Sequence, residues 1–351
     1  MAYQQKHGVN IGRWLCHGDD PLEQREKWLV QDDLRKIRDM GLDHVRLCLK
    51  EKYFWAEDGT LNPRAIDILR RGIDWALDAG LVANVNLHIL RSHNFLDLQE
   101  PELFTSPTAQ AHFVKMWTDL HDNLHDYSTD KLAFEFMNEP VARANERWNT
   151  VWQQAYDALR AREKERVLIL GSNLWNQART FKDLTVPEND PNMMLDFHFY
   201  EPILVSHYHA PWTPITMVPF KLHYPGRPFH MPAWLFGLYA QFKSGLSSIN
   251  RKDAWHENVP FTKEIMASRF QLALDVAKKH NLPLNLGEFG VYSQVPQEVG
   301  KKWLHDAFSL CQDMNISWTI WSLGKGDDGF AIMDKAGNPR WQVDVMRPFL
   351  K

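Results

Sequence analysis

Two glutamates stand where strand-like runs of apolar residues end. Glu139 closes the run in FEFMNEP (134–140), directly after Asn138, and Glu288 lies near the end of LPLNLGEFG (282–290). A pair of carboxyl groups cleaves a glycosidic bond when one protonates the leaving oxygen and the other attacks the anomeric carbon. If the fold brings these two side chains together, we expect Glu139 to be the acid/base and Glu288 the nucleophile.

Other polar and aromatic residues occupy the same kind of position, at or near the ends of further predicted strands: Arg46, His88, His198, Tyr200 and Trp321. Arg46 near Glu288 would keep that carboxylate ionised, and a hydrogen bond from Tyr200 would act in the same direction. Burial and its negative neighbour would keep Glu139 partly protonated. Two identical side chains would then have different chemical roles.

The elements that must position these residues alternate regularly. Apolar strand patterns occupy 8–15, 43–49, 82–90, 132–139, 166–172, 193–200, 282–290 and 316–323, with amphipathic helical patterns between most of them. Eight buried strands covered by helices predict an α/β fold, a closed parallel (β/α)8 TIM barrel, with 1–351 as one catalytic domain. The alternative is a doubly wound open sheet, which the absence of GxGxxG after the first strand disfavours.

The stretch 203–260 is longer than an ordinary connection after a barrel strand. We interpret it as an aromatic- and proline-rich insertion after strand six. About half of its aromatic residues are expected to form a small core, and Trp212 is expected to extend the cleft as a platform for sugar rings. The aromatics are Trp212, Tyr224, Trp234, Phe236, Tyr239, Phe242 and Trp255.

Composition restricts the partners. The net charge of −4 and the lack of a lysine- or arginine-rich run argue against nucleic acid and membrane surfaces, and favour a neutral substrate. The 15 tryptophans exceed what a core usually needs. Core packing is expected to explain most of them, and the others suit the apolar faces of sugars. His207 and His209 have the spacing of metal ligands, but without an acid cluster they are better read as solvent-facing or sugar-contacting. We expect no metal and no cofactor.

The strand ends GVNIGRWL, HVRL, VNLHIL, FEFMNEP, DFHFY, LGEFG and IWSL resemble those of glycoside hydrolase family 5, the cellulase family, over nearly the whole chain. The resemblance implies a retaining endo-β-1,4-glucanase that acts on β-glucan oligo- or polysaccharides. It implies that Asn138 binds the sugar 2-hydroxyl, that His88 and His198 line the same subsite, and that Trp321 stacks under the sugar. In this family the peptide after that tryptophan is often cis.

Several alternatives stay open at this point. A β-mannanase, a mixed-linkage glucanase, a xyloglucanase or an exo-acting β-glycosidase could use the same scaffold. A non-catalytic carbohydrate-binding barrel and a metal-dependent barrel hydrolase lie outside the class, and the latter is disfavoured because the first strand offers only Asn10 instead of HxH. A polymer substrate favours a secreted or periplasmic protein, with cytoplasmic location as the alternative. The oligomeric state is left open.

Structural roles are expected for several other polar residues. Glu135 and Asp196 are expected to be buried structural acids, with Glu135 paired to a base. Glu201, directly before Pro202, is expected to begin a loop. Arg46 could form an ion pair inside the barrel, and His88 could be a core histidine, but their joint placement with two glutamates favours a site.

Overall fold

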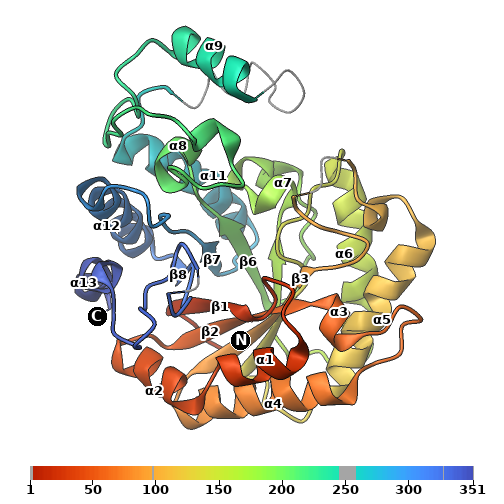
Figure 1. Ribbon diagram of the computed structural model, residues 1–351. Coiled ribbons are helices and arrows are strands. Elements are labelled where there is room, and N and C mark those ends of the chain that lie inside the picture. Colours follow the sequence, from red (N-terminus) through yellow and green to blue (C-terminus); the bar gives the residue numbers. More distant parts are fainter. Residues whose placement is uncertain (1–2, 97–98, 245–257, 327, 351) are drawn as a thin grey trace.

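Eight parallel strands close into a barrel in the computed structural model, which describes residues 3–96, 99–244, 258–326 and 328–350 (Figure 1). Each strand pairs with the next along the chain, and β8 pairs with β1. The (β/α)8 prediction is confirmed. The strands are β1 (His7–Leu15), β2 (His44–Lys50), β3 (Val82–Ile89), β4 (Leu132–Glu135), β5 (Leu168–Gly171), β6 (Met193–His198), β7 (Leu284–Glu288) and β8 (Ser317–Ile320).

Several strands are shorter than the sequence pattern suggested, and β4 is the clearest case. It ends at Glu135, so Asn138 and Glu139 lie on the segment beyond it. That segment is still tied to both neighbouring strands, because the backbone N–H of Phe136 donates to Ile169 and that of Asn138 donates to Leu87. Both residues are therefore held at the mouth of the barrel by backbone hydrogen bonds.

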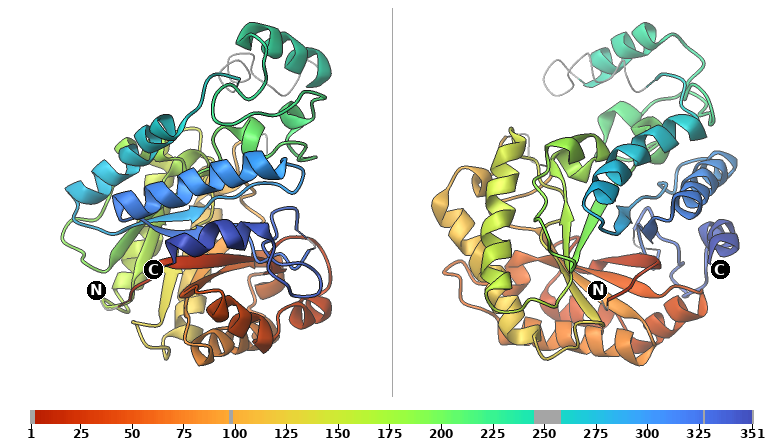
Figure 2. Two further views of the ribbon diagram at one scale, coloured as in Figure 1. Left: turned by 90° about the vertical axis from the view of Figure 1, so that its left-hand side faces the viewer. Right: turned by 180° about the vertical axis from the view of Figure 1, so that it is seen from behind.

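Helices surround the barrel (Figures 1 and 2). The connection from β1 to β2 contains two helices instead of one, because Leu29 and Val30 adopt extended backbone and Asp33 accepts from the Val30 N–H. The helices are α1 (Leu22–Trp28), α2 (Gln31–Asp39), α3 (Glu51–Phe54), α4 (Pro63–Asp78), α5 (Pro107–Leu124), α6 (Asn145–Arg160), α7 (Asn173–Asn176), α11 (Lys263–Lys279), α12 (Gln297–Met314) and α13 (Trp341–Met346), with short 3-10 turns at Glu102–Phe104, Ala178–Asp183 and Arg347–Phe349.

The connection from β6 to α11 contains α8 (Ile203–Ser206), a 3-10 turn (Pro214–Thr216) and α9 (Ala233–Ser244). The aromatic- and proline-rich pattern of this stretch does not predict a helix, yet α9 has 12 residues. α9 lies apart from the helical ring in all three views (Figures 1 and 2). Tyr224 and Phe236 are buried, whereas Trp234 is exposed. Trp255 and the side chain of Phe242 fall outside the described residues.

Two different environments fill the molecule. Between strands and helices the core is apolar and contains seven almost completely buried tryptophans: Trp14, Trp55, Trp117, Trp148, Trp152, Trp303 and Trp318. Among the fully buried residues of the strands, in contrast, are several polar ones, including Asn10, Arg46, Asn86, Glu135 and Asp196. A buried polar group has to be hydrogen-bonded to be tolerated. These groups form the network that positions the site.

Candidate active site

Glu139 and Glu288 face each other at the ends of β4 and β7. One carboxylate oxygen of each, together with a ring nitrogen of His198, forms a group whose members all lie within 4.8 Å of one another. Nδ1 of His198 is 2.9 Å from Oε1 of Glu139 and 3.7 Å from Oε2 of Glu288. Both glutamates are almost completely buried. The barrel therefore brings together two carboxylates that are 149 positions apart in the sequence.

Arg46, on β2, connects this pair to the interior of the barrel. Its Nη1 donates to Oε1 of Glu288 at 2.7 Å, and its Nε and Nη2 donate to the two oxygens of Glu135 at 2.7 and 2.6 Å. Nη2 also donates to Oδ1 of Asn138. Glu135 in turn accepts from the amide of Asn86. The expectation of a buried structural acid paired to a base is thus confirmed for Glu135.

The amide of Asn138 is polarised by this contact. Its Oδ1 is occupied by Arg46, while its Nδ2 is buried and has no acceptor within hydrogen-bond distance among the residues that the structure describes. Buried donors of this kind are rare in folded proteins and usually have a functional explanation. The free N–H group is suited to a ligand hydroxyl.

Tyr200, two residues beyond β6, donates its hydroxyl to Oε2 of Glu288 at 3.2 Å. Burial and the charges of Glu288 and Glu139 raise the pKa of Tyr200 well above its ordinary value. The phenol therefore stays protonated and remains a donor. Glu288 accepts from both Arg46 and Tyr200, and hydrogen bonds to the charged form of a carboxylate favour ionisation.

Glu139 has the opposite environment. Burial and the nearby charge of Glu288 raise the pKa of Glu139, although His198 opposes this effect. Burial acts to lower the pKa of His198, but the three surrounding carboxylates raise it to about 10, so that the imidazole is cationic at neutral pH. The third of these carboxylates is Asp196, a buried structural acid as expected.

His88 and Trp321 form another wall of the site. Their rings stack with centroids 5.4 Å apart, and both are nearly buried. Nδ1 of His88 contacts Oδ1 of Asn86 at 3.0 Å. Burial and the nearby ring of His17 lower the pKa of His88 well below its ordinary value, so this imidazole is neutral. The peptide between Trp321 and Ser322 is cis, as the family resemblance implied.

Trp212, in the β6–α11 connection, is 47% exposed. Its ring contacts Tyr292 edge-on at 5.1 Å and lies 6.3 Å from Phe330, which in turn lies 5.9 Å from Tyr200. The expected platform is thus continuous with the aromatic residues beside Glu288.

The solvent-facing interpretation of His207 is wrong, because its ring is buried against Tyr200.

Two residues next to the site were missed by sequence reasoning. His17, just beyond β1, contacts His88 and Trp321. Trp175 is 41% exposed, and its indole N–H donates to the carbonyl of Phe95 while its backbone N–H donates to Pro140, the neighbour of Glu139. Leu174, Trp175 and Asn176 all have a positive φ angle. Residues other than glycine rarely adopt this backbone conformation, and the sequence does not reveal it. The available signal was their position directly after the fifth strand.

The remaining candidates lie elsewhere or have structural contacts. Glu201 precedes a cis proline and is 3.3 Å from Arg269, consistent with the start of a loop. Nε2 of His209 donates to the carbonyl of Val218.

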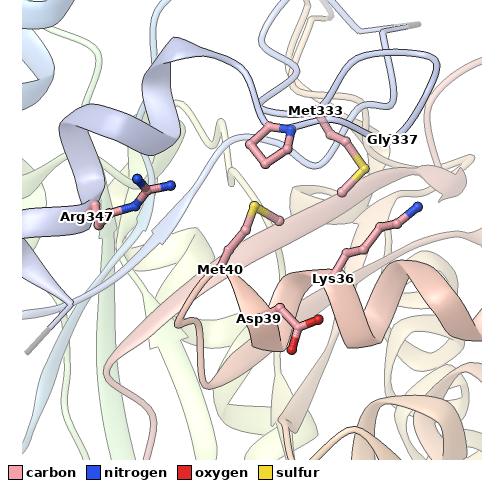
Figure 3. Close-up of a pocket in the computed structure, with 7 residues that line it drawn as sticks. Lys36, Asp39, Met40, Met333, Gly337 and Arg347 are labelled. Carbon is pink, nitrogen blue, oxygen red and sulfur yellow. The ribbon is translucent and has the colours of Figure 1, made fainter.

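A separate hollow of about 210 Å³ lies on the outside of the barrel, by α2 and the segment before α13 (Figure 3). Its lining contains none of the residues described above: Lys36, Asp39, Met40, Met333, Gly337, Pro339 and Arg347.

A closed (β/α)8 barrel with two buried carboxylates at the ends of β4 and β7 defines a glycoside hydrolase. The family model described as "Cellulase (glycosyl hydrolase family 5)" matches residues 16–327, and the chain belongs to this family. The family and the enzyme class expected from the strand ends are therefore confirmed.

An endoglucanase and a cellodextrinase are among the proteins similar to this chain. The chain is 26% identical to Endoglucanase C of Acetivibrio thermocellus, with 95% of both chains covered, and 26% identical to Cellodextrinase A of Ruminococcus flavefaciens, with 84% of this chain and 79% of the relative covered. Its fold matches Cel5A of Thermotoga maritima, solved in complex with cellobiose and with mannotriose, with a TM-score of 0.75 at 21% identity and 99% and 97% coverage. Within the described ranges, no helix has the length and apolar character needed to cross a bilayer.

Proposed function

We propose that this family 5 hydrolase is a retaining endo-β-1,4-glucanase that cleaves β-glucan by double displacement, with Glu139 as acid/base and Glu288 as nucleophile. The observation that carries the proposal is the close approach of the two carboxylates, with oxygens within 4.8 Å. Retaining enzymes place these groups about 5–5.5 Å apart, whereas inverting enzymes need about 6.5–9.5 Å to admit a water molecule. The shorter separation supports retention.

In the first step, Glu139 donates its proton to the glycosidic oxygen while a carboxylate oxygen of Glu288 attacks the anomeric carbon. The bond between that carbon and the leaving oxygen breaks, and a glycosyl ester of Glu288 forms. The raised pKa of Glu139 suits a proton donor, and the hydrogen bonds from Arg46 and Tyr200 suit an ionised nucleophile.

In the second step, the Glu139 carboxylate removes a proton from water, the water oxygen attacks the anomeric carbon and the ester bond breaks. The negative charge is on Glu288 before the first step and on Glu139 after it. Because Nδ1 of His198 lies within 3.7 Å of both groups, its cation stabilises either arrangement. His198 would thus stabilise the single negative charge of the pair in both steps.

The sugar at the cleavage point would be held by the neighbouring side chains. The unpaired amide N–H of Asn138 is a donor for the 2-hydroxyl, and hydrogen bonds to this hydroxyl strengthen in the transition state. The exposed ring of Trp212 offers a stacking surface further along a glucan chain. We further propose that residues 1–351 form one catalytic domain that includes the insertion at about 203–260. We also propose that the protein is exported, because its substrate is a polymer.

The test is a panel of soluble polysaccharides and oligosaccharides with product lengths and anomeric configuration followed over time. Random shortening of β-1,4-glucan with β-configured first products supports an endo-acting retaining enzyme. First products of α configuration would overturn retention, and release of a single short product from one chain end would overturn endo action.

β-Mannan is the second candidate substrate. Thermotoga maritima Cel5A, which shares the fold, has been solved with mannotriose as well as cellobiose. The same panel decides between them, because a mannanase would hydrolyse mannan with higher kcat/KM than β-1,4-glucan.

A further inference from the structure

Cys16, His17 and His88 place a sulfur and two ring nitrogens within 4.8 Å of one another beside the candidate active site. We propose that these three residues bind one Zn²⁺ or a similar borderline-soft divalent cation, and that this cation blocks the sugar subsite and reversibly inhibits the enzyme. One cysteine and two histidines are a ligand set that suits zinc. Metal binding depends only on the contacts of these three residues, whereas the inhibition rests on the function proposed above.

The two histidines have nearly the right separation. Their Nε2 atoms are 3.1 Å apart. Two imidazole nitrogens bound to the same tetrahedral zinc, each at about 2.0–2.1 Å, are about 3.3 Å apart. A sulfur bound to the same zinc at about 2.3 Å would lie about 3.6 Å from each ring nitrogen. From the limit of 4.8 Å, the sulfur of Cys16 therefore has to approach the nitrogens by at most about 1.2 Å.

The hydrogen-bond network already orients the His88 ligand atom. Asn86 donates its amide to Glu135, so its Oδ1 is free to accept from Nδ1 of His88. The proton of neutral His88 is therefore on Nδ1, and the lone pair of Nε2 points at His17. Groups that fix the tautomer in this way commonly support histidine ligands of metals.

His17 has to change its tautomer before it can bind the metal. It donates from Nε2 to His88, whereas no hydrogen bond of its Nδ1 is found in the described part of the chain. Moving the proton from Nε2 to Nδ1 through solvent frees the second lone pair, and His17 is partly exposed to solvent. Cys16 would lose its thiol proton to water when the metal binds. Arg13, Lys50 and Arg25 act against further positive charge at His17. Lys50 is paired with Asp19 and Arg25 with Asp20, which limits the repulsion from these two.

A bound ion at this place would interfere with catalysis. His88 stacks on Trp321 and His17 contacts the edge of the same indole. A metal bound to the two imidazoles, with its fourth position open to water, would lie against the ring of Trp321, which is expected to stack under the sugar. Zinc would therefore compete with substrate.

The experiment uses the full-length enzyme and Co²⁺ as a spectroscopic probe. We expect one equivalent of Co²⁺ to give the sulfur-to-cobalt charge-transfer absorption of a thiolate ligand, Zn²⁺ to displace it, and hydrolysis to fall with Zn²⁺ and return with a chelator. Cys16→Ala should abolish the absorption, and His17→Gln should weaken Co²⁺ binding at least about tenfold. Cys311→Ala, a buried cysteine in α12, is the control and should bind like wild type.

Each variant's activity with Zn²⁺ is compared with its own metal-free activity. The absence of a thiolate absorption in the wild type, or undiminished Zn²⁺ inhibition in Cys16→Ala, would overturn the proposal. Because the absorption needs no turnover, it also reads out His17→Gln, and a failure of the proposed glucanase activity is distinguishable from a failure of this site.

Discussion

Arg46 donates to Oε1 of Glu288 across 2.7 Å, in a place where the arginine is completely buried and the glutamate nearly so. The same guanidinium holds Glu135 through two further bonds. A single cation is thus shared between a carboxylate at the mouth and one inside the barrel. The charge state of Glu288 at the mouth therefore depends on Glu135, which lies deeper in the barrel.

This sharing predicts that Glu135→Gln destabilises the protein although it leaves the shape of the side chain nearly unchanged. Glutamine replaces one acceptor oxygen by an NH2 group that faces the donors of Arg46 and Asn86. Arg46 keeps Glu288 as a partner, but a buried charged donor that loses its acceptor costs roughly 3 kcal/mol. The free energy of unfolding measured in urea should fall by about that amount. Glu23→Gln, which removes an exposed partner of Arg64, is the control and should change it by less than about 1 kcal/mol. Equal effects of both changes would contradict the argument.

The two catalytic carboxylates should respond differently to substitution. Glu288→Gln removes the nucleophile and is expected to abolish turnover of every substrate. Glu139→Gln should reduce hydrolysis of polysaccharide by about 10²–10⁴-fold, yet spare the first step for aryl glycosides with very good leaving groups, which need no proton. The measurement is the burst of released phenol under pre-steady-state conditions. Equal damage by both changes across leaving groups would refute these roles.

The cation of His198 should set the upper limit of the pH range. Loss of the Glu139 proton as pH rises ends its function as an acid, so kcat/KM falls through the pKa of Glu139. His198 opposes the rise of that pKa by stabilising the carboxylate. Replacing His198 with asparagine removes this stabilisation, so the pKa of Glu139 should rise and the alkaline limb should move to higher pH. A limb that moves to lower pH would contradict this. His305→Asn, an exposed histidine of α12, is the control.

Asn138 should act through the sugar 2-hydroxyl. Asn138→Ala is expected to lower kcat/KM by about 10²-fold, since a donor aimed at the transition state is removed. A 2-deoxy substrate should cause a similar loss in the wild type but little further loss in the variant. Such a cycle isolates the pairwise contact. Additive losses would show that Asn138 does not meet this hydroxyl.

Trp212 should contribute binding without chemistry. Trp212→Ala is expected to raise KM for longer oligosaccharides roughly tenfold, about 1.4 kcal/mol, with kcat nearly unchanged, because stacking stabilises ground state and transition state alike. Trp234→Ala is the matched control, since Trp234 is an exposed tryptophan of α9. An unchanged KM for Trp212→Ala would remove this residue from the cleft.

The sequence predicted the barrel well because buried parallel strands are continuous apolar runs and the helices are amphipathic. It also located Glu139, Glu288 and Arg46, because polar residues at strand ends stand out against those runs. It missed Trp175, whose exposure follows from a left-handed backbone segment that no propensity indicates. It missed His17, whose contact with His88 depends on how β1 and β3 lie in the closed barrel. Long-range side-chain contacts of this kind are not encoded in local periodicity.

The candidate site is assembled from the ends of β2, β3, β4, β6, β7 and β8, and the first and last strands of the chain meet directly. A chain in which β8 has not yet paired with β1 holds only a subset of these side chains in place. Hydrolytic activity is therefore a sensor of ring closure. The recovery of activity during refolding would show when the barrel has closed, without any label on the protein.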